Sequence, residues 1–224
     1  VLTDDNFATI VKAVKNGRNV YANIKRAIQF LLSGNAAGIL TVLYASLLGL
    51  PVPFAAVHLL FINLLTDSLP AIALGLEPHT DRVMHEKPRP RNEGILTRPF
   101  LTSVAIEGFV IAVATIVAFH IGLANGGAAL GSTMAFSTLC LSRLFHGFNC
   151  RGKESIVKLG LGSNQYSLMA FGVGLLLLAL VLFVPAMESL FLVAPLTGMD
   201  VLYVVLLAFA PTLLIQLTRL IQGR

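Results

Sequence analysis

The sequence predicts an all-α membrane protein with six transmembrane helices, the first of which continues from a cytoplasmic stalk helix. Of its 224 residues, 56% are hydrophobic and only 12% are charged, against about 25% charged in soluble domains. The mean hydropathy is +0.82. Six apolar runs are each long enough, at about 20 residues, to cross a bilayer as a helix. The predicted spans are 27–49, 54–75, 99–121, 132–150, 166–186 and 199–221.

Residues 1–26 precede the first span and are polar and amphipathic. No proline separates them from the apolar run that follows, so one helix is expected to contain both the stalk and the first span. Such a helix of about 40 residues would be about 60 Å long and could carry motion from a cytoplasmic domain into the bilayer. Because the chain begins with Val1, we expect it to be the C-terminal part of a longer polypeptide.

Positive charge gathers on one side of the predicted bundle. Every Lys and Arg except Arg143 falls in the stalk, in loop 76–98, in loop 151–164 or at the C-terminus. By the positive-inside rule both termini are cytoplasmic, and the expected location is a plasma (inner) membrane. This asymmetry explains the isoelectric point of about 9.5, so the expected partner is membrane lipid and no nucleic acid is expected to bind.

An aspartate lies within the second predicted span. A charged side chain at that depth costs about 2.5–3.5 kcal/mol, so Asp67 needs a partner, and a bound cation is the simplest one. Asn63, Thr66 and Asp67 are spaced i, i+3, i+4, which would place them on one face of an α-helix. Their amide, hydroxyl and carboxylate oxygens are ligands that calcium takes. Pro70 is expected to break the helix and to free backbone carbonyls as further ligands.

Three further polar residues are predicted at a similar depth. Counted from the span ends at about 1.5 Å per residue, Asn35, Glu107 and Arg143 share one broad layer with Asp67. Buried ions require neutralisation, so Arg143 is expected to pair with Asp67 or with Glu107. The alternative for these polar side chains is hydrogen bonding between helices that holds the bundle together.

Three segments of the sequence carry a resemblance to a known family. They are LTDDNFATIVKAVKNGRNVYANIKRAIQFLLSGN (2–35), NLLTDSLPAIALGLEP (63–78) and EKPRPRNEGILTRPF (86–100). In this order and spacing they are similar to parts of P-type calcium pumps, the family of the sarcoplasmic reticulum and bacterial calcium ATPases. The parts are the last cytoplasmic helix with the long helix that it feeds, the sixth membrane helix, and the basic loop after it. The likeness runs to about residue 150, and more loosely to the end.

The resemblance implies the C-terminal transmembrane half of an ATP-driven calcium export pump, which is an enzyme when full length. Residues 1–26 would be the end of the cytoplasmic phosphorylation domain and the stalk, and residues 27–224 the six-helix transmembrane domain. ATP and Mg²⁺ would act only in the full-length protein, because this sequence contains neither the phosphorylation motif nor the nucleotide-binding domain. The N-terminal half, with four preceding helices and the cytoplasmic domains, would be the partner of this chain.

The resemblance also implies an ion site for transported Ca²⁺. Pumps that carry two ions have glutamates at the positions of Gly38 and Arg143, and both changes remove carboxylates from the same site. The hypothesis is therefore one calcium per cycle, with the Arg143 guanidinium in the vacated cation position and Glu107 as a second counter-charge. The metal ligands in this chain would be Asn35, Asn63, Thr66 and Asp67, about half of the full set.

Three alternatives remain open at this point. The transported ion could be Mn²⁺ or another cation, because all-oxygen sites accept both calcium and manganese. The six spans could also work alone as a secondary cation transporter or channel. A membrane scaffold without transport is the third alternative, and it predicts that Asp67→Asn leaves the activity of the full-length protein intact.

Overall fold

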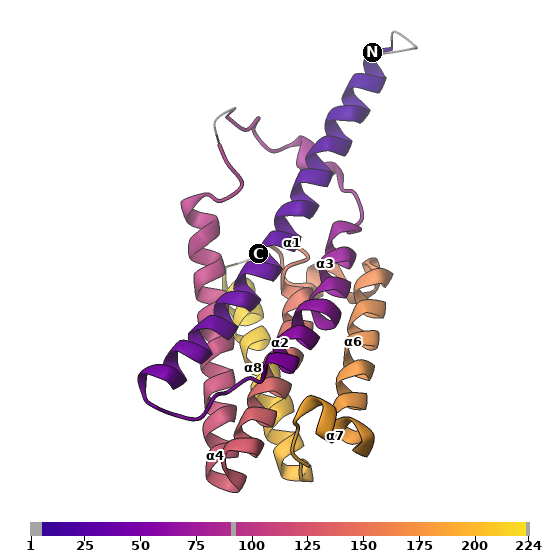
Figure 1. Ribbon diagram of the computed structural model, residues 1–224. Coiled ribbons are helices and arrows are strands. Elements are labelled where there is room, and N and C mark those ends of the chain that lie inside the picture. Colours follow the sequence, from indigo (N-terminus) through magenta and orange to yellow (C-terminus); the bar gives the residue numbers. More distant parts are fainter. Residues whose placement is uncertain (1–5, 91–92, 223–224) are drawn as a thin grey trace.

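The computed structural model describes residues 6–90 and 93–222, and every regular element within those ranges is helical (Figure 1). The long helices are α1 (Phe7–Leu47), α4 (Arg98–Asn149), α6 (Gln165–Phe183) and α8 (Gly198–Ile221). The shorter elements are α2 (Ala56–Phe61), the π-helix η1 (Ile62–Thr66), α3 (Ser68–Gly75), η2 (Asp81–Met84), α5 (Ile156–Leu159), η3 (Leu161–Ser163) and α7 (Pro185–Phe191).

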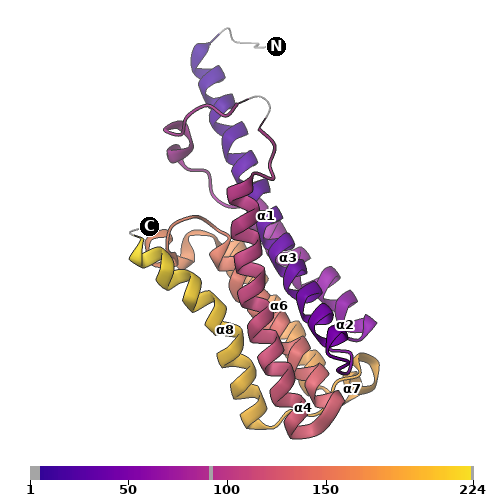
Figure 2. The same cartoon turned by 90° about the vertical axis from the view of Figure 1, so that its left-hand side faces the viewer.

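By length and composition, five helices in the described part of the chain could cross a membrane: α1, the unit from α2 to α3, α4, α6 and α8. Six spans were predicted, and the difference lies in α4, which contains both 99–121 and 132–150. Gly126 and Gly127 interrupt it with non-helical backbone, and Gly127 has a φ of 75°. In Figures 1 and 2 the ribbon reverses at this point, and the first half (98–125) and second half (128–149) of α4 lie side by side.

Helix α1 runs without interruption for 41 residues. It packs closely against the first half of α4 at Gly108, where an added Cβ would lie 2.8 Å from the backbone oxygen of Ser33. The start of α1 projects beyond the other helices, and the loop after α3 accompanies it (Figures 1 and 2). One long helix thus connects the projecting part of the molecule to the interior of the bundle.

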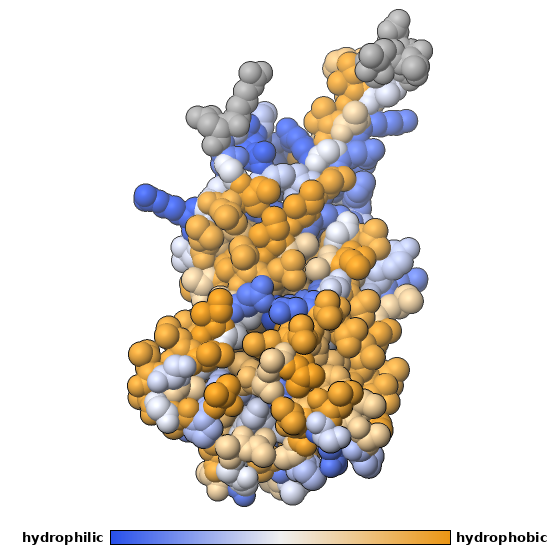
Figure 3. All heavy atoms as spheres, in the orientation of Figure 1, coloured by the Kyte–Doolittle hydropathy of each residue, from blue (hydrophilic) through white to orange (hydrophobic). Residues whose placement is uncertain are grey.

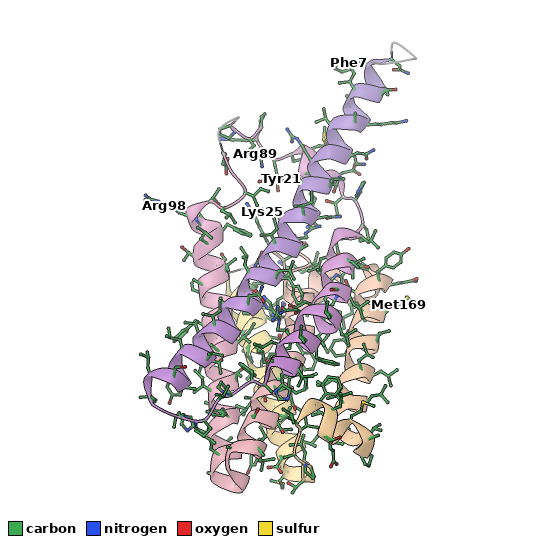
Figure 4. The ribbon with its side chains drawn as sticks, viewed as in Figure 1. Phe7, Tyr21, Lys25, Arg89, Arg98 and Met169 are labelled. Atoms are coloured by element: carbon green, nitrogen blue, oxygen red, sulfur yellow. The ribbon has the colours of Figure 1, made fainter. Side chains whose placement is uncertain are left out.

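The loop after α3 is fastened along α1 by side chains of the helix. Asn19 exchanges two hydrogen bonds with the backbone of Thr80, of 3.2 and 3.0 Å. Arg18 and Asn23 donate further bonds of 2.7–3.1 Å to the carbonyls of Gly75, Glu77, Val83 and Glu86. The Arg89 guanidinium lies 3.9 Å from the ring centroid of Tyr21, and Figure 4 shows these two side chains directed toward each other. The loop and this part of α1 therefore form one unit.

The interior of the bundle is apolar and so is its outer surface. Phe119, Met134 and Phe136 are fully buried in the core. Large apolar side chains on α6 and α8, such as Leu176 and Leu206, are 60% and 58% exposed. Figure 3 shows that hydrophobic residues cover most of the bundle surface, while hydrophilic residues gather at the projecting end. An exposed apolar belt of this extent is typical of helices that face lipid.

Candidate cation site

A buried ion pair between Arg143 and Asp67 forms the centre of the candidate site. Asp67 lies between η1 and α3, and Arg143 lies on the second half of α4. The side chains are only 4% and 2% exposed, and Arg143 Nη2 donates to Asp67 Oδ2. Of the two partners predicted for Arg143, the structure has Asp67. The pair is neutral as a unit, which lowers the cost of placing both charges inside the bundle.

Helix α1 makes room for the guanidinium at Gly34. A Cβ at this position would lie 2.3 Å from Arg143 Nε and 2.5 Å from Cζ, so any larger residue would displace the arginine. The next residue, Asn35, accepts a long hydrogen bond of 3.4 Å from Arg143 Nη2. The absence of a side chain at Gly34 thus allows α1, α3 and α4 to meet around one cation.

The backbone just before Asp67 is a π-helix, whereas the sequence analysis assumed an α-helix. Residues 62–66 form a π-helix, closed by a 2.9 Å bond from the Asp67 N–H to the Ile62 carbonyl. In this chain Asn63 is exposed, whereas Thr66 and Asp67 are buried. The wider turn still keeps residues four apart at a similar angle around the helix axis, so the shared face of Asn63 and Asp67 stays a prediction.

The irregular backbone also lies earlier than predicted. Pro70 sits within α3 instead of ending a helix, and the π-helix precedes it. Because proline has no N–H, it cannot bond to the carbonyl of Thr66 four residues before. The Thr66 hydroxyl donates to the Ile62 carbonyl at 3.1 Å. The proline therefore affects the turn that leads into Asp67. This turn is a π-bulge, a form often found at functional sites.

The ion pair leaves hydrogen-bonding capacity unused. Within the described residues, Asp67 Oδ1 and Arg143 Nε are buried atoms without a hydrogen-bond partner. Asn35 and Asn63 are exposed, and Figure 3 shows hydrophilic atoms in the middle of the apolar belt on the face that carries α1 and α3. The unused donor and acceptor atoms of the pair thus lie inside the bundle, and the side chains of Asn35 and Asn63 lie at its surface.

Glu107, the other partner predicted for Arg143, contacts different groups. Its carboxylate accepts two 2.8 Å bonds from Gln29, and it lies 3.5 Å from His146 Nε2 and 3.9 Å from Arg219 Nη2. Gln29 precedes Asn35 by six residues, about 9 Å along α1. Glu107 therefore belongs to a separate polar layer, which depth counting from span ends could not resolve.

A second buried arginine–carboxylate pair was missed by the sequence analysis. Glu77 follows α3, and Arg151 follows α4. Arg151 Nε and Nη2 donate to the Glu77 carboxylate at 2.9–3.2 Å, and Asn164 Nδ2 adds a bond of 2.6 Å. Arg151 Nη1 donates to the carbonyls of Gly160 and Leu161. The only sequence signal was that both charges stand just beyond the ends of apolar runs.

Comparisons with known proteins give one consistent result. Residues 51–221 match the family described as cation transporting ATPase, C-terminus. The chain is 40% identical over 217 residues to a calcium-transporting ATPase of Bacillus subtilis, a match that covers 96% of this chain and 24% of that protein. It is 44% identical over 171 residues to calcium-transporting ATPase 1 of Lactococcus lactis (76% and 19% covered). A yeast relative, calcium-transporting ATPase 1 of Saccharomyces cerevisiae, is 31% identical over 223 residues (98% and 24% covered). The chain spans about a quarter or less of the length of these relatives.

Proposed function

Because this chain belongs to the family of cation transporting ATPases and matches its C-terminal part, we propose that it forms the C-terminal membrane half of an ATP-driven calcium export pump. The observation that carries the proposal is the buried Asp67–Arg143 pair, with its unused carboxylate oxygen and with the exposed amides of Asn35 and Asn63 on neighbouring elements. A carboxylate in this setting, with amide and hydroxyl oxygens nearby, has the chemistry of a hard-cation ligand. The relatives are named calcium-transporting ATPases, which favours a pump over a stand-alone transporter.

In the proposed topology the two halves of α4 are separate spans, which gives six in total. Residues 1–26 would be the end of the phosphorylation domain and the stalk, and residues 27–224 the membrane domain. The charge asymmetry of the loops supports cytoplasmic termini and fits a plasma (inner) membrane. The N-terminal half would supply the ATP and Mg²⁺ chemistry and four further helices, which would cover the exposed side chains of Asn35 and Asn63.

The ligand set that we propose is Asn35, Asn63, Thr66 and Asp67, completed by groups from the N-terminal half. Arg143 would hold the position of one cation permanently, because a guanidinium stays protonated. Its bond to Asp67 and its long contact with Asn35 support this role. With that position filled, room for one calcium remains, and the pump would move one calcium per cycle. Glu107 would not take part, since its carboxylate is bonded elsewhere.

The test is a count of bound ions in the full-length protein. We expect one calcium per phosphorylation site in the parent, and the same for Arg143→Lys, which keeps a positive charge. Arg143→Glu removes the tethered cation and adds a carboxylate, so a second, weaker calcium should bind. Two calcium ions in the parent, or unchanged stoichiometry with normal transport in Arg143→Glu, would contradict the proposal. Transport of Mn²⁺ in preference to Ca²⁺ in the same vesicles would correct the ion identity.

A further inference from the structure

The polar cluster around His146 lies one helical turn beyond Arg143 on α4. His146 is 1% exposed, and its Nε2 lies 2.9 Å from Ser33 Oγ, 3.2 Å from Cys150 Sγ and 3.5 Å from Glu107 Oε2. Glu107 is 7% exposed. The proposed transport mechanism uses none of these groups. A buried histidine beside a buried carboxylate is nevertheless a place where a proton can bind.

The hydrogen bonds on both sides of the ring fix which nitrogen carries the proton. On one side, the Ser33 hydroxyl donates to the Gln29 carbonyl at 2.7 Å, so its oxygen is available to accept from His146 Nε2. On the other side, a chain of amides begins at a backbone group. The Ile156 N–H donates to Gln216 Oε1 at 2.9 Å, which leaves the Gln216 amide nitrogen to donate to Asn149 Oδ1 at 2.7 Å.

The series of hydrogen bonds from Ile156 through Gln216 determines the orientation of the Asn149 side chain. With its oxygen bound to Gln216, Asn149 presents its amide nitrogen to His146 Nδ1 at 3.4 Å. Asn149 Nδ2 also donates to Thr212 Oγ1 at 3.2 Å. Since the group facing Nδ1 is a donor, Nδ1 is the acceptor, and the neutral ring carries its proton on Nε2. Both sides of the ring indicate the same tautomer.

A second proton on the ring conflicts with this arrangement. It would bind at Nδ1, where it would face the N–H groups of Asn149, and two donors cannot bond to each other. Rotation of the Asn149 amide by half a turn would supply an oxygen to Nδ1. It would also present Nδ2 to Gln216, which must then turn its oxygen toward Asn149. The Ile156 N–H would lose its acceptor.

We propose that His146 is the proton-binding residue of a second intramembrane site, and that its occupancy is transmitted through Asn149 and Gln216 to the backbone at Ile156. Glu107, on the first half of α4, balances the added charge. The other charged or titratable groups that face the pair are Arg219 on α8 and Cys150 on the helix of His146; α1 contributes the uncharged Gln29 and Ser33. The site joins α1, both halves of α4, α8 and the first residue of α5, and it does not depend on which cation is carried.

A metal ion is the alternative occupant, because the donor atoms of Glu107, His146 and Cys150 lie within 4.8 Å of one another. That spacing suits a tetrahedral zinc ion. A histidine that binds metal through Nε2 normally donates its other N–H to an acceptor, whereas here an amide donor faces Nδ1. The Glu107 carboxylate is also already hydrogen-bonded by Gln29. The geometry therefore favours the proton.

Hydrogen–deuterium exchange of the full-length protein tests the proposal without any transport assay. After correction for intrinsic chemical exchange, the peptide that contains Ile156 should exchange about tenfold faster at acidic than at neutral pH in the parent. His146→Gln should abolish this transition, because glutamine does not titrate. The matched control is His120→Gln, at an exposed histidine on the first half of α4, which should keep the transition. A transition that is absent from the parent, or that persists in His146→Gln, overturns the proposal.

A second variant separates the relay from general loosening at low pH. In Gln216→Glu the carboxylate can accept from Ile156 and from a reversed Asn149 at once, so the Ile156 amide should stay protected at both pH values. If the Ile156 amide of Gln216→Glu loses protection at acidic pH as the parent does, the proposed relay is overturned. The metal alternative is tested by elemental analysis: zinc that is present in Cys140→Ser but lost in Cys150→Ser would overturn the proton assignment, and its absence from the parent supports it.

Discussion

Two buried arginine–carboxylate pairs connect the same two parts of the molecule, and they differ in how completely they are satisfied. Asp67–Arg143 joins the start of α3 to the second half of α4, and Glu77–Arg151 joins the residues just beyond both elements. At Glu77 both carboxylate oxygens and the arginine nitrogens have partners. At Asp67, one carboxylate oxygen and one arginine nitrogen have none among the described residues.

The difference indicates that the Glu77–Arg151 pair stabilises the fold, whereas the Asp67–Arg143 pair is available for a ligand. A fully hydrogen-bonded buried pair fixes two segments relative to each other, and removal of one partner leaves an uncompensated charge. A pair with an unused carboxylate oxygen, next to exposed amides on α1 and η1, can still bind another ion. Four substitutions test this distinction between the two pairs.

Arg151→Ala should have the largest effect on stability. It leaves the Glu77 carboxylate buried without its arginine, at a cost of about 3–5 kcal/mol in the free energy of unfolding. Thermal unfolding of the purified full-length protein should show a large drop in melting temperature. The double change Arg151→Met with Glu77→Gln removes both charges and should recover part of it. Equal stability of Arg151→Ala and the parent would remove the distinction between the pairs.

Asp67→Asn should lower calcium binding, and it also destabilises the fold because it leaves the buried Arg143 guanidinium without its counter-charge. The amide is nearly isosteric and can still accept from Arg143, but the negative charge that attracts the cation is lost. We expect calcium affinity to fall about a hundredfold, or about 2.7 kcal/mol, with loss of calcium-dependent phosphorylation. Calcium binding to the full-length protein measures this effect. An intact activity would instead favour the scaffold alternative.

Gly34→Ala should have an intermediate effect through Arg143. The new Cβ would displace the guanidinium, whereas at Gly38 the nearest atom to an added Cβ, Leu139 Cδ2, lies at an ordinary 3.8 Å. Gly38→Ala is therefore the matched control, since both changes raise helix propensity by about 1 kcal/mol. We expect a calcium affinity about tenfold lower for Gly34→Ala alone. Equal affinities of the two variants would show that the packing at Gly34 does not matter.

Asp81→Asn should have the smallest effect. The hydrogen bond and charge of Lys15 lower the pKa of Asp81, so this pair stabilises the folded state above the unfolded pKa, near 3.9. The contribution is lost as the pH falls through the lower folded value. Because Asp81 is exposed to solvent, its screened ion pair adds little at neutral pH. Melting temperatures of variant and parent should agree at pH 7, and a clear difference would mean that the loop depends on this contact.

The sequence predicted what depends on local pattern. Long apolar runs gave the helices, and an aspartate inside one of them drew attention to Asp67 and to Arg143. The π-helix at 62–66 was not predicted, because apolar spacing does not distinguish it from an α-helix. The groups that contact Glu107 were not predicted, because they depend on how far α1 and α4 slide past each other. The packing at Gly108 and Gly34 decides this relative position.

The contact at Gly108 has a mechanical consequence for α1. It lies at Ser33, with about 39 Å of helix between it and Phe7 at the start of α1, and about 21 Å between it and Leu47 at the end. A rigid helix held at an interior point tilts about that point, so its two ends move in opposite directions. Gly34 and Asn35 stand beside this point and hardly move when the helix tilts. Only rotation of α1 about its own axis, or sliding along it, would widen the space at Gly34 that receives the Arg143 guanidinium.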